Sequence, residues 1–504
     1  MLISRIVNKF EMANWRYIGL TVLAVQIVIF FPIAWLQLIN SDEGFYLLAA
    51  KLVMGGKILY HDFFYPQAPL LPYIYGLWMK VFGFNWYSAR SLSAILTILL
   101  GGLIYLQITN LFRRRVLGLA AVVIYASSSL VFGWYTLVKT FTLSTLLLFG
   151  AYFLLERRLW LLSGLLLGLA VDTRLFFIAI IPAFLIGIYQ SEKGSSSRLI
   201  AYRAFFAGVA MALLPNLFFI IINPENFLFN NLGYHATRSA YGLIGNFTQK
   251  GVIVLRLFGL QWVEGVIGFQ FMLLFLINAY YLLTKLWVKK RLALSFNITL
   301  FLFFVSLLPT PAWFEYFSVL IPFMIVTSFY VIADSQGSLK YFLIMIIGFY
   351  VLVAPLDGFR YISRQKGIEG ASPRFTNPIN WDISTIDQIS QEIDKNTGVN
   401  EYVASGWPGY FLQSNRAIFP GMEFPYLQQA IWPRIDENRL DRYKIISPYR
   451  LKNVIKEHEV HLIVWGNCAI KHPYRELILA SGYSLLKTIG DTEIFIWPNK
   501  RTNK

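Results

Sequence analysis

The sequence is poor in cysteine, histidine and charged residues. Its single cysteine, Cys468, excludes an intrachain disulfide and any metal cluster built on cysteine. Five histidines among 504 residues argue against a dedicated histidine metal site. Charged residues make up 14% of the chain, whereas a soluble globular chain has about 25%. Most of the chain is therefore expected to be surrounded by lipid.

Apolar residues dominate instead: 57% of the chain is hydrophobic, and 43 residues are phenylalanine. The net charge of +17 could suggest a nucleic-acid partner. However, lysine and arginine gather in short segments between apolar runs, as the positive-inside rule describes for cytoplasmic loops. The charge therefore predicts membrane topology, and no nucleic-acid partner is expected.

Eleven apolar runs are predicted to span a membrane. Arg5, Lys9 and Arg16 precede the first run, so the amino terminus is predicted to be cytoplasmic. An odd number of spans then places the residues after the last one outside the cytoplasm. The predicted fold class is an α-helical polytopic protein of the plasma membrane with a small extracytoplasmic α/β domain. The runs are residues 17–38, 88–111, 116–134, 137–155, 159–171, 175–189, 204–222, 262–283, 292–308, 317–332 and 341–356.

The composition changes after the last run, which divides the chain into a transmembrane domain, 1–356, and a carboxyl-terminal domain, 357–504. Ser447 and Pro448 are typical of a helix start, and no GxGxxG phosphate loop is found there. Strands are predicted at residues 402–404, 417–419 and 461–465, with a closing hairpin at 485–489 and 493–497. This segment therefore predicts a small α/β domain.

The segment from Asn40 to Gly83, within the predicted first outer loop 39–87, carries an unusual set of acids. Asp42 and Glu43 follow the first span directly, and Asp62 comes twenty residues later. Charged residues at a membrane boundary usually have a function. Two short helices are expected to lie in the membrane interface: one starting at a Ser41 cap and ending at Gly55 and Gly56, the other at residues 70–82.

An acid just outside a span can take a proton from an acceptor hydroxyl while a leaving group departs from the other side of the reacting carbon. If the donor is a lipid-phosphate sugar, the leaving group is an anion, and cations should stabilise it. Lys139, Arg174 and Arg238, the last in a predicted long outer loop at 223–261, lie on the same predicted side. They are the candidate phosphate-binding residues.

The motif SDEG followed by HDFFYPQAPL, placed after the first span, resembles the GT-C glycosyltransferases. The resemblance is to bacterial protein O-mannosyltransferase and aminoarabinose transferase types of the broad family 39 group. It implies a GT-C fold, a polyprenyl-phosphate sugar donor, inversion at the anomeric carbon, and Asp42, with Glu43 beside it, as the catalytic acid. Gln67 and Ala68 stand where the aminoarabinose enzymes tend to carry a basic residue, a difference that bears on the donor.

Each candidate has a second interpretation. Asp42 and Glu43 could merely favour a helix amino terminus, and Glu43 could orient Asp42. Lys139 could extend its amine to the interface, and Arg174 could pair with Asp172. The candidate acceptor residues are Asp62, Tyr65, Gln67, Glu315 and Tyr316. Asp62 could instead be structural or pair with His61, and Glu315 and Tyr316 could belong to an aromatic belt.

The leading interpretation is a sugar transferase acting outside the cytoplasm. The alternatives are a lipid-linked glycan flippase without chemistry, and a ligase or polymerase joining whole glycans. A flippase would be expected to show repeated halves and broken helices around buried charges. The identity of the acceptor, whether protein, lipid or glycan, stays open. The need for a divalent metal ion also stays open, although no metal-ligand cluster is predicted.

Overall fold

A computed structural model of the chain describes residues 15–237, 242–260, 265–363, 378–424, 431–466 and 473–498. The chain folds into two compact units, each assembled from separate stretches. The first unit comprises Met1–Leu36, Ser91–Leu214 and Tyr241–Ile362, and the second comprises Gln37–Arg90, Pro215–Ala240 and Ser363–Lys504. The division at residue 356 stays a prediction about domains, but the compact units join residues 37–90 to the carboxyl-terminal segment.

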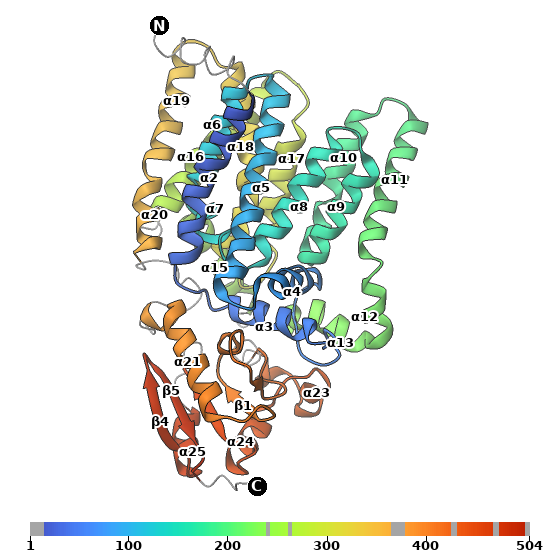
Figure 1. Cartoon of the computed structure of the whole chain (residues 1–504). Helices are drawn as coiled ribbons and strands as arrows, with labels where there is room; N and C mark the ends of the chain where they lie inside the picture. The colour runs from blue at the N-terminus through green and yellow to red at the C-terminus, as the bar shows by residue number, and fades with distance from the viewer. Residues whose placement is uncertain are drawn as a thin grey trace. The chain divides into compact units, whose positions relative to one another are not determined.

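The described part of the first unit is helical (Figure 1). Apolar runs fold this way because a helix satisfies its own backbone hydrogen bonds in lipid. Its elements are α2 (Trp15–Leu36), α5 (Trp86–Phe112, whose first turn belongs to the second unit), α6 (Arg115–Ala126), α7 (Ser129–Trp134), α8 (Thr140–Leu155), α9 (Trp160–Thr173), η1 (Leu175–Ile180), α10 (Ile181–Ser191), α11 (Ser195–Leu213), α15 (Gly242–Leu257), α16 (Gly265–Trp287), α17 (Leu294–Leu307), η4 (Phe314–Leu320), α18 (Ile321–Asp334), α19 (Gly337–Leu352) and α20 (Ala354–Ile362).

Five helices among the described residues are long and apolar enough to cross a membrane, or six if one bent pair, Ser195–Leu213 with Asn216–Ile222, is a single span. Five shorter apolar helices accompany them. The predicted number of eleven spans and their orientation stay predictions. One predicted run, 116–134, is broken at Ser127 and Ser128 between α6 and α7.

Glycine allows two helices of the first unit to pack closely. A Cβ atom at Gly164 of α9 would lie 1.9 Å from the Phe205 carbonyl oxygen of α11. A Cβ atom at Gly208 of α11 would lie 2.1 Å from the Leu161 carbonyl oxygen. Small residues that bring helix backbones together are typical of membrane helix packing, because lipid provides no hydrophobic force between helices.

The predicted long loop at 223–261 is wrong for its described residues, which are mostly helical. They form α13 (Pro224–Leu228), a π-helical turn η2 (Phe229–Gly233), α14 (Tyr234–Thr237) and α15. The Asn223 side chain accepts a hydrogen bond of 3.1 Å from the Asn226 N–H, and Pro224 occupies the first helical position. This cap and proline are a helix-start signal in the sequence.

In the second unit, α3 (Glu43–Met54) and α4 (Leu70–Phe82) take the place of the two predicted interfacial helices. A helix lying in the interface should expose one face, but every residue of α3 from Glu43 to Ala50 is buried. Gly44 faces Gly409 and Trp407, and a Cβ atom there would lie 2.8 Å from both. The helix also begins after Asp42 rather than after Ser41, a shift within the usual uncertainty of helix ends.

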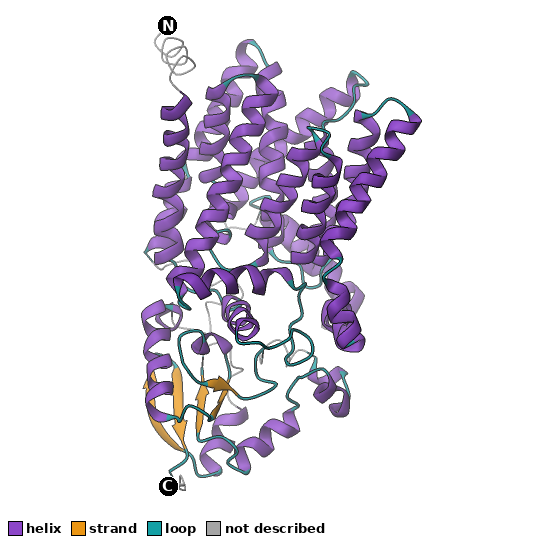
Figure 2. Ribbon diagram, turned by 45° about the vertical axis from the view of Figure 1, so that its right-hand side comes forward, coloured by secondary structure: helices purple, strands orange, loops and turns teal. Residues whose placement is uncertain are grey.

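A five-stranded sheet, drawn in orange in Figure 2, forms the carboxyl-terminal part of the second unit. Its order is β2-β1-β3-β5-β4, with β1 parallel to β2 and β3, and β5 antiparallel to β3 and β4. The predicted strands and hairpin are confirmed, and the Ser447 Oγ atom caps α24 as predicted. The strands are β1 (Tyr402–Ser405), β2 (Ala417–Ile418), β3 (Leu462–Trp465), β4 (Ser484–Ile489) and β5 (Thr492–Ile496), and the accompanying helices are α12 (Asn216–Ile222), η5 (Pro378–Trp381), α21 (Ile383–Asn396), η6 (Pro408–Phe411), η7 (Trp432–Arg434), α23 (Glu437–Arg442), α24 (Pro448–Lys456) and α25 (Pro473–Ala480).

Candidate functional site

Glu43 forms a fully buried ion pair with Arg90 inside the second unit. Arg90 donates from Nε to Glu43 Oε1 at 2.9 Å and from Nη2 to Oε2 at 2.6 Å, and both side chains have 0% exposure. The guanidinium also donates to the carbonyl oxygens of Gln37 and Leu38. Both oxygens of Glu43 are thus engaged, which favours its predicted orienting role over direct proton transfer.

Asp42 lies on a turn that its neighbours hold rigidly. Its N–H donates to Asn40 Oδ1 at 3.1 Å, and the Asn40 N–H donates to Glu43 Oε2 at 2.8 Å. The Trp407 indole donates to the Ser41 carbonyl at 2.9 Å. The partly exposed Asp42 side chain accepts no capping hydrogen bond from α3. The structure therefore places a carboxylate on a fixed backbone, as a proton acceptor requires.

Two of the predicted phosphate-binding cations lie together in the first unit. Lys139 is the residue before α8, with 3% exposure, and its Nζ atom lies 3.3 Å from Glu315 Oε1. Arg174, with 7% exposure, follows α9. Its guanidinium carbon lies 4.2 Å from the ring centre of Phe141, and the Lys139 amine lies 5.9 Å from the same ring. Both buried cations thus lie beside the ring of Phe141, in the first turn of α8.

Aromatic rings surround the Arg174 guanidinium. Besides Phe141, the rings of Phe176 and Tyr316 lie 4.3 and 5.0 Å from its central carbon. The Lys139 amine also lies 4.9 Å from the Trp134 ring. Cation–π contacts of this kind hold a cation in place at a cost lower than bare burial. Tyr316 and Glu315 are neighbours of the predicted phosphate-binding cations, and their role in lining an acceptor cavity stays a prediction.

The other predicted site residues are dispersed. Arg238 lies outside the described residues. Tyr65 is buried among the rings of Phe45, Tyr46 and Tyr60, and burial raises the pKa of its hydroxyl well above the usual value. The Gln67 carbonyl accepts from the Tyr60 hydroxyl at 2.7 Å. Tyr65 and Gln67 are therefore packing and turn residues, and their acceptor role stays a prediction.

Asp62 lines a cavity of about 440 Å³ in the second unit. Its Oδ2 atom accepts from the Ile58 N–H at 2.7 Å, and its Oδ1 atom lies 2.8 Å from His61 Nδ1. Burial favours a higher pKa for Asp62, but these hydrogen bonds and the charges of His61 and Lys57 outweigh it, so the pKa lies below the usual value. Asp62 is thus an ionised acceptor with a fixed orientation.

Glu423 lines the same cavity with opposite properties. Its Oε2 atom is buried and has no hydrogen-bond partner among the described residues. Burial raises the pKa of Glu423 to about 8, against the lowering effect of the backbone N–H groups of Glu423 and Gly421 and of Lys57. Glu423 is therefore protonated at neutral pH and can donate a hydrogen bond.

This pKa predicts a pH-dependent stability. The unfolded chain releases the Glu423 proton near its ordinary pKa of 4.5, whereas the folded chain keeps it up to about 8. The folded state thus holds more protons between these values, so the free energy of unfolding falls as pH rises through this window. Thermal unfolding in detergent from pH 5 to 9 should show this fall, and Glu423→Gln should flatten it. An unchanged slope in the variant would contradict the assignment.

Arg90 and the residues around the cavity, apart from Asp62, were not predicted from the sequence. Arg90 had a signal, since an arginine inside an apolar run needs a buried partner. Lys57, Tyr402 and Glu423 had none, because the fold joins them across more than three hundred residues. The described residues contain no group of three or more histidine, cysteine, aspartate or glutamate side chains that could hold a metal ion.

The chain has the fold of the GT-C glycosyltransferases, a class of multi-pass membrane proteins, which confirms the resemblance predicted from the sequence. Residues 66–222 match the family described as dolichyl-phosphate-mannose-protein mannosyltransferase. No curated protein matches the sequence.

Three solved structures are similar over most of the chain. ArnT from Cupriavidus metallidurans in the apo state has a TM-score of 0.66 and 11% identity, covering 95% of this chain and 97% of that one. The same protein bound to undecaprenyl phosphate has a TM-score of 0.65 and 12% identity, covering 97% and 99%. The Archaeoglobus fulgidus oligosaccharyltransferase, in complex with zinc and sulfate, has a TM-score of 0.52 and 12% identity, covering 88% and 67%. At these identities the similarity establishes the fold.

Proposed function

We propose that this protein is a membrane glycosyltransferase that moves a sugar from a polyprenyl-phosphate donor to an acceptor hydroxyl outside the cytoplasm, with inversion. The observation that carries the proposal is the pair of buried cations, Lys139 and Arg174, on the shared Phe141 ring. Ionisable residues inside a membrane-helix unit are costly and usually mark a substrate site. Support also comes from the ArnT structure of the same fold that holds undecaprenyl phosphate.

The proposed roles follow from the chemistry of each side chain. Arg174 has a planar fork that suits a phosphate, and Lys139 supplies a point charge at the amino terminus of α8. These groups stabilise the charge that develops on the phosphate oxygens as the sugar leaves. Asp42 takes the proton of the acceptor hydroxyl, while Glu43 and Arg90 fix the turn that carries it.

Lys139 and Glu315 form a pair that also fits this proposal. Their atoms lie 3.3 Å apart in a site with little exposure, so the carboxylate offsets the cost of burying the amine. We propose that Glu315 serves as counter-ion to Lys139 rather than as an acceptor ligand.

Donor binding is tested at Arg174. A charge-assisted hydrogen bond contributes about 1.5–3 kcal/mol, so Arg174→Met should weaken binding of undecaprenyl phosphate by about tenfold to a hundredfold. Arg174→Lys should have an intermediate effect, because lysine keeps the charge but loses the fork. The measurement is titration of undecaprenyl phosphate into the purified protein in nanodiscs.

Arg157 provides the matched control for this test. Its guanidinium also lies on an aromatic ring, 3.4 Å from the centre of Phe153, and donates to Gln107. It follows the other end of α8, a helix of 16 residues that is about 24 Å long at the helical rise per residue. Arg157→Met should leave the affinity unchanged. Equal weakening by both methionine variants, or unchanged affinity in Arg174→Met, would contradict the phosphate assignment.

A further inference from the structure

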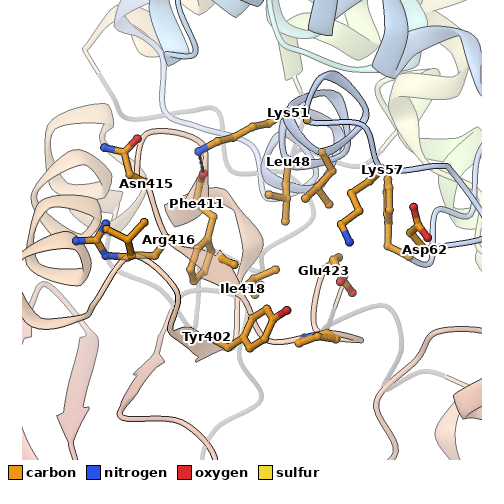
Figure 3. Close-up of a pocket in the computed structure, with 16 residues that line it drawn as sticks. Leu48, Lys51, Lys57, Asp62, Tyr402, Phe411, Asn415, Arg416, Ile418 and Glu423 are labelled. Carbon is orange, nitrogen blue, oxygen red and sulfur yellow. Dashed lines mark hydrogen bonds between the residues drawn. The ribbon is translucent and has the colours of Figure 1, made fainter. Parts of the chain in front are cut away.

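The cavity beside Asp62 has the size and walls of a small-molecule site. Its volume of about 440 Å³ lies within the range of about 300–1,000 Å³ typical of ligand pockets. It belongs entirely to the second unit. Helix α3, the chain from Lys57 to Phe63, and the carboxyl-terminal residues from Val399 to Glu423 contribute its walls. Figure 3 shows the side chains that line it.

Lys51 fixes one wall of the cavity through three hydrogen bonds to backbone carbonyl oxygens. The Lys51 Nζ atom donates to the carbonyl oxygens of Phe411, Leu412 and Ser414 at 2.8, 3.2 and 2.6 Å. All three donors of the ammonium group are thereby occupied. Lys51 joins α3 to the carboxyl-terminal segment and gives the cavity a defined shape, and it is not expected to contact a ligand.

The remaining polar groups can both donate and accept hydrogen bonds. Figure 3 shows the Lys57 amine and the Tyr402 hydroxyl extending toward the side of the cavity that carries Glu423. Lys57 is exposed and carries three donors, and the carboxyl group of Glu423 has a buried oxygen without a partner among the described residues. Asp62 accepts hydrogen bonds from its side of the cavity.

Apolar surface lies between these groups. Leu48, Ile418 and Tyr402 line the cavity, and Tyr402 is 47% exposed. An aromatic ring beside mixed donors and acceptors suits a ligand with one apolar face and a rim of hydroxyl groups. A sugar ring has this character. Charges of both signs line the cavity, the cationic Lys57 and Arg416 as well as the ionised Asp62, so the walls do not select a ligand of one charge. A metal ion would lack a cluster of ligands among the described residues.

We propose that this cavity binds a neutral sugar ring of a glycan, with the ring face on Tyr402 and its hydroxyl groups on Lys57, Asp62 and Glu423. The inference goes beyond the proposed transfer reaction, because binding here requires neither the donor nor Asp42. It makes the second unit a glycan-binding element.

The proposal is tested by saturation-transfer NMR on the full chain in nanodiscs without donor. The probes are methyl mannoside and methyl glucoside. The wild-type protein should bind these neutral glycosides. Absence of binding by both would overturn the proposal.

Substitutions of the residues that line the cavity test whether the glycosides bind there. Tyr402→Ala should weaken the binding by about threefold to tenfold, the scale of one aromatic contact. Tyr449→Ala is the control, because Tyr449 is an exposed tyrosine of the second unit that does not line the cavity. Glu423→Ala should bind more weakly, because it removes a hydrogen-bonding group from the wall of the cavity.

The same assay separates this proposal from the transferase function. Asp42→Asn should bind the glycosides as the wild type does, whether or not it transfers sugar. Unaltered binding in both Tyr402→Ala and Glu423→Ala would overturn the site. Thermal unfolding of each variant shows that a loss of binding is not a loss of fold.

Discussion

Asp42→Asn is expected to reduce sugar transfer by at least about a hundredfold, because general-base catalysis contributes about 10²–10⁴-fold. An amide keeps the shape of the side chain but cannot accept the proton of the acceptor hydroxyl. The affinity for undecaprenyl phosphate and the thermal unfolding temperature should stay close to wild type, because Asp42 is partly exposed and an amide has nearly the size and shape of a carboxylate. Transfer is measured by mass spectrometry as release of undecaprenyl phosphate from donor lipids extracted from the native membrane.

A matched control exists for this variant. Asp436 also occupies the N-cap position of a helix of the second unit, where, unlike Asp42, its side chain accepts a hydrogen bond, from the Asn438 N–H. It is exposed and lies in neither site. Asp436→Asn should transfer sugar at the wild-type rate. Expression of Asp42→Asn in a strain lacking the gene should leave the envelope glycans as in the deletion.

The outcomes of this experiment also distinguish the alternative functions. Undiminished release by Asp42→Asn would show that another group takes the proton. A wild-type protein that moves lipid-linked sugar across liposomes without releasing undecaprenyl phosphate would support the flippase interpretation. Transfer of whole glycans rather than single sugars, seen in the product masses, would support a ligase or polymerase.

Arg90→Met is expected to cost about 3–5 kcal/mol of stability, because it leaves the buried Glu43 carboxylate without its cation. The carbonyl oxygens of Gln37 and Leu38 also lose the hydrogen bonds that Arg90 donates. The loss should appear as a large decrease in the thermal unfolding temperature in detergent. Transfer should fall as well, because Glu43 helps to hold the turn of Asp42.

The control is a second arginine–glutamate pair in the same unit. Arg450 pairs with Glu459 through both terminal nitrogens, but both side chains are partly exposed. Exposed pairs contribute about 0–1 kcal/mol, so Arg450→Met should change the unfolding temperature little. The double variant Glu43→Leu with Arg90→Met should recover part of the loss, since no unpaired charge stays buried. Equal destabilisation by both single methionine variants would contradict the role of burial.

Local patterns were sufficient for much of the fold. The long helices α5 and α16 of the first unit follow apolar runs, because a backbone in lipid has few alternatives to a helix. The start of α24 at Ser447 and Pro448, and the hairpin of β4 and β5, follow from caps and turns that act over a few residues. Asp42 could be singled out from the sequence for the same reason, since its position after an apolar run is a local feature.

The burial of α3 was not predictable, because its apolar residues are compatible with lipid as well as with protein neighbours. The Glu43–Arg90 pair joins residues 47 positions apart, and the Lys139–Glu315 pair joins residues 176 positions apart. No local pattern specifies such partners, since their energies arise only when the chain brings them out of water together.

The sequence alone determined that this is a helical membrane protein with a mixed carboxyl-terminal segment and an acid beside its first apolar run. Composition and periodicity decide these features, because they depend on how each short stretch meets lipid or water. The tertiary structure decided which charges are partners and where Lys57, Tyr402 and Glu423 form a cavity with Asp62. Those residues are far apart in the sequence and come together only when the chain folds, so no short stretch of sequence predicts their contacts.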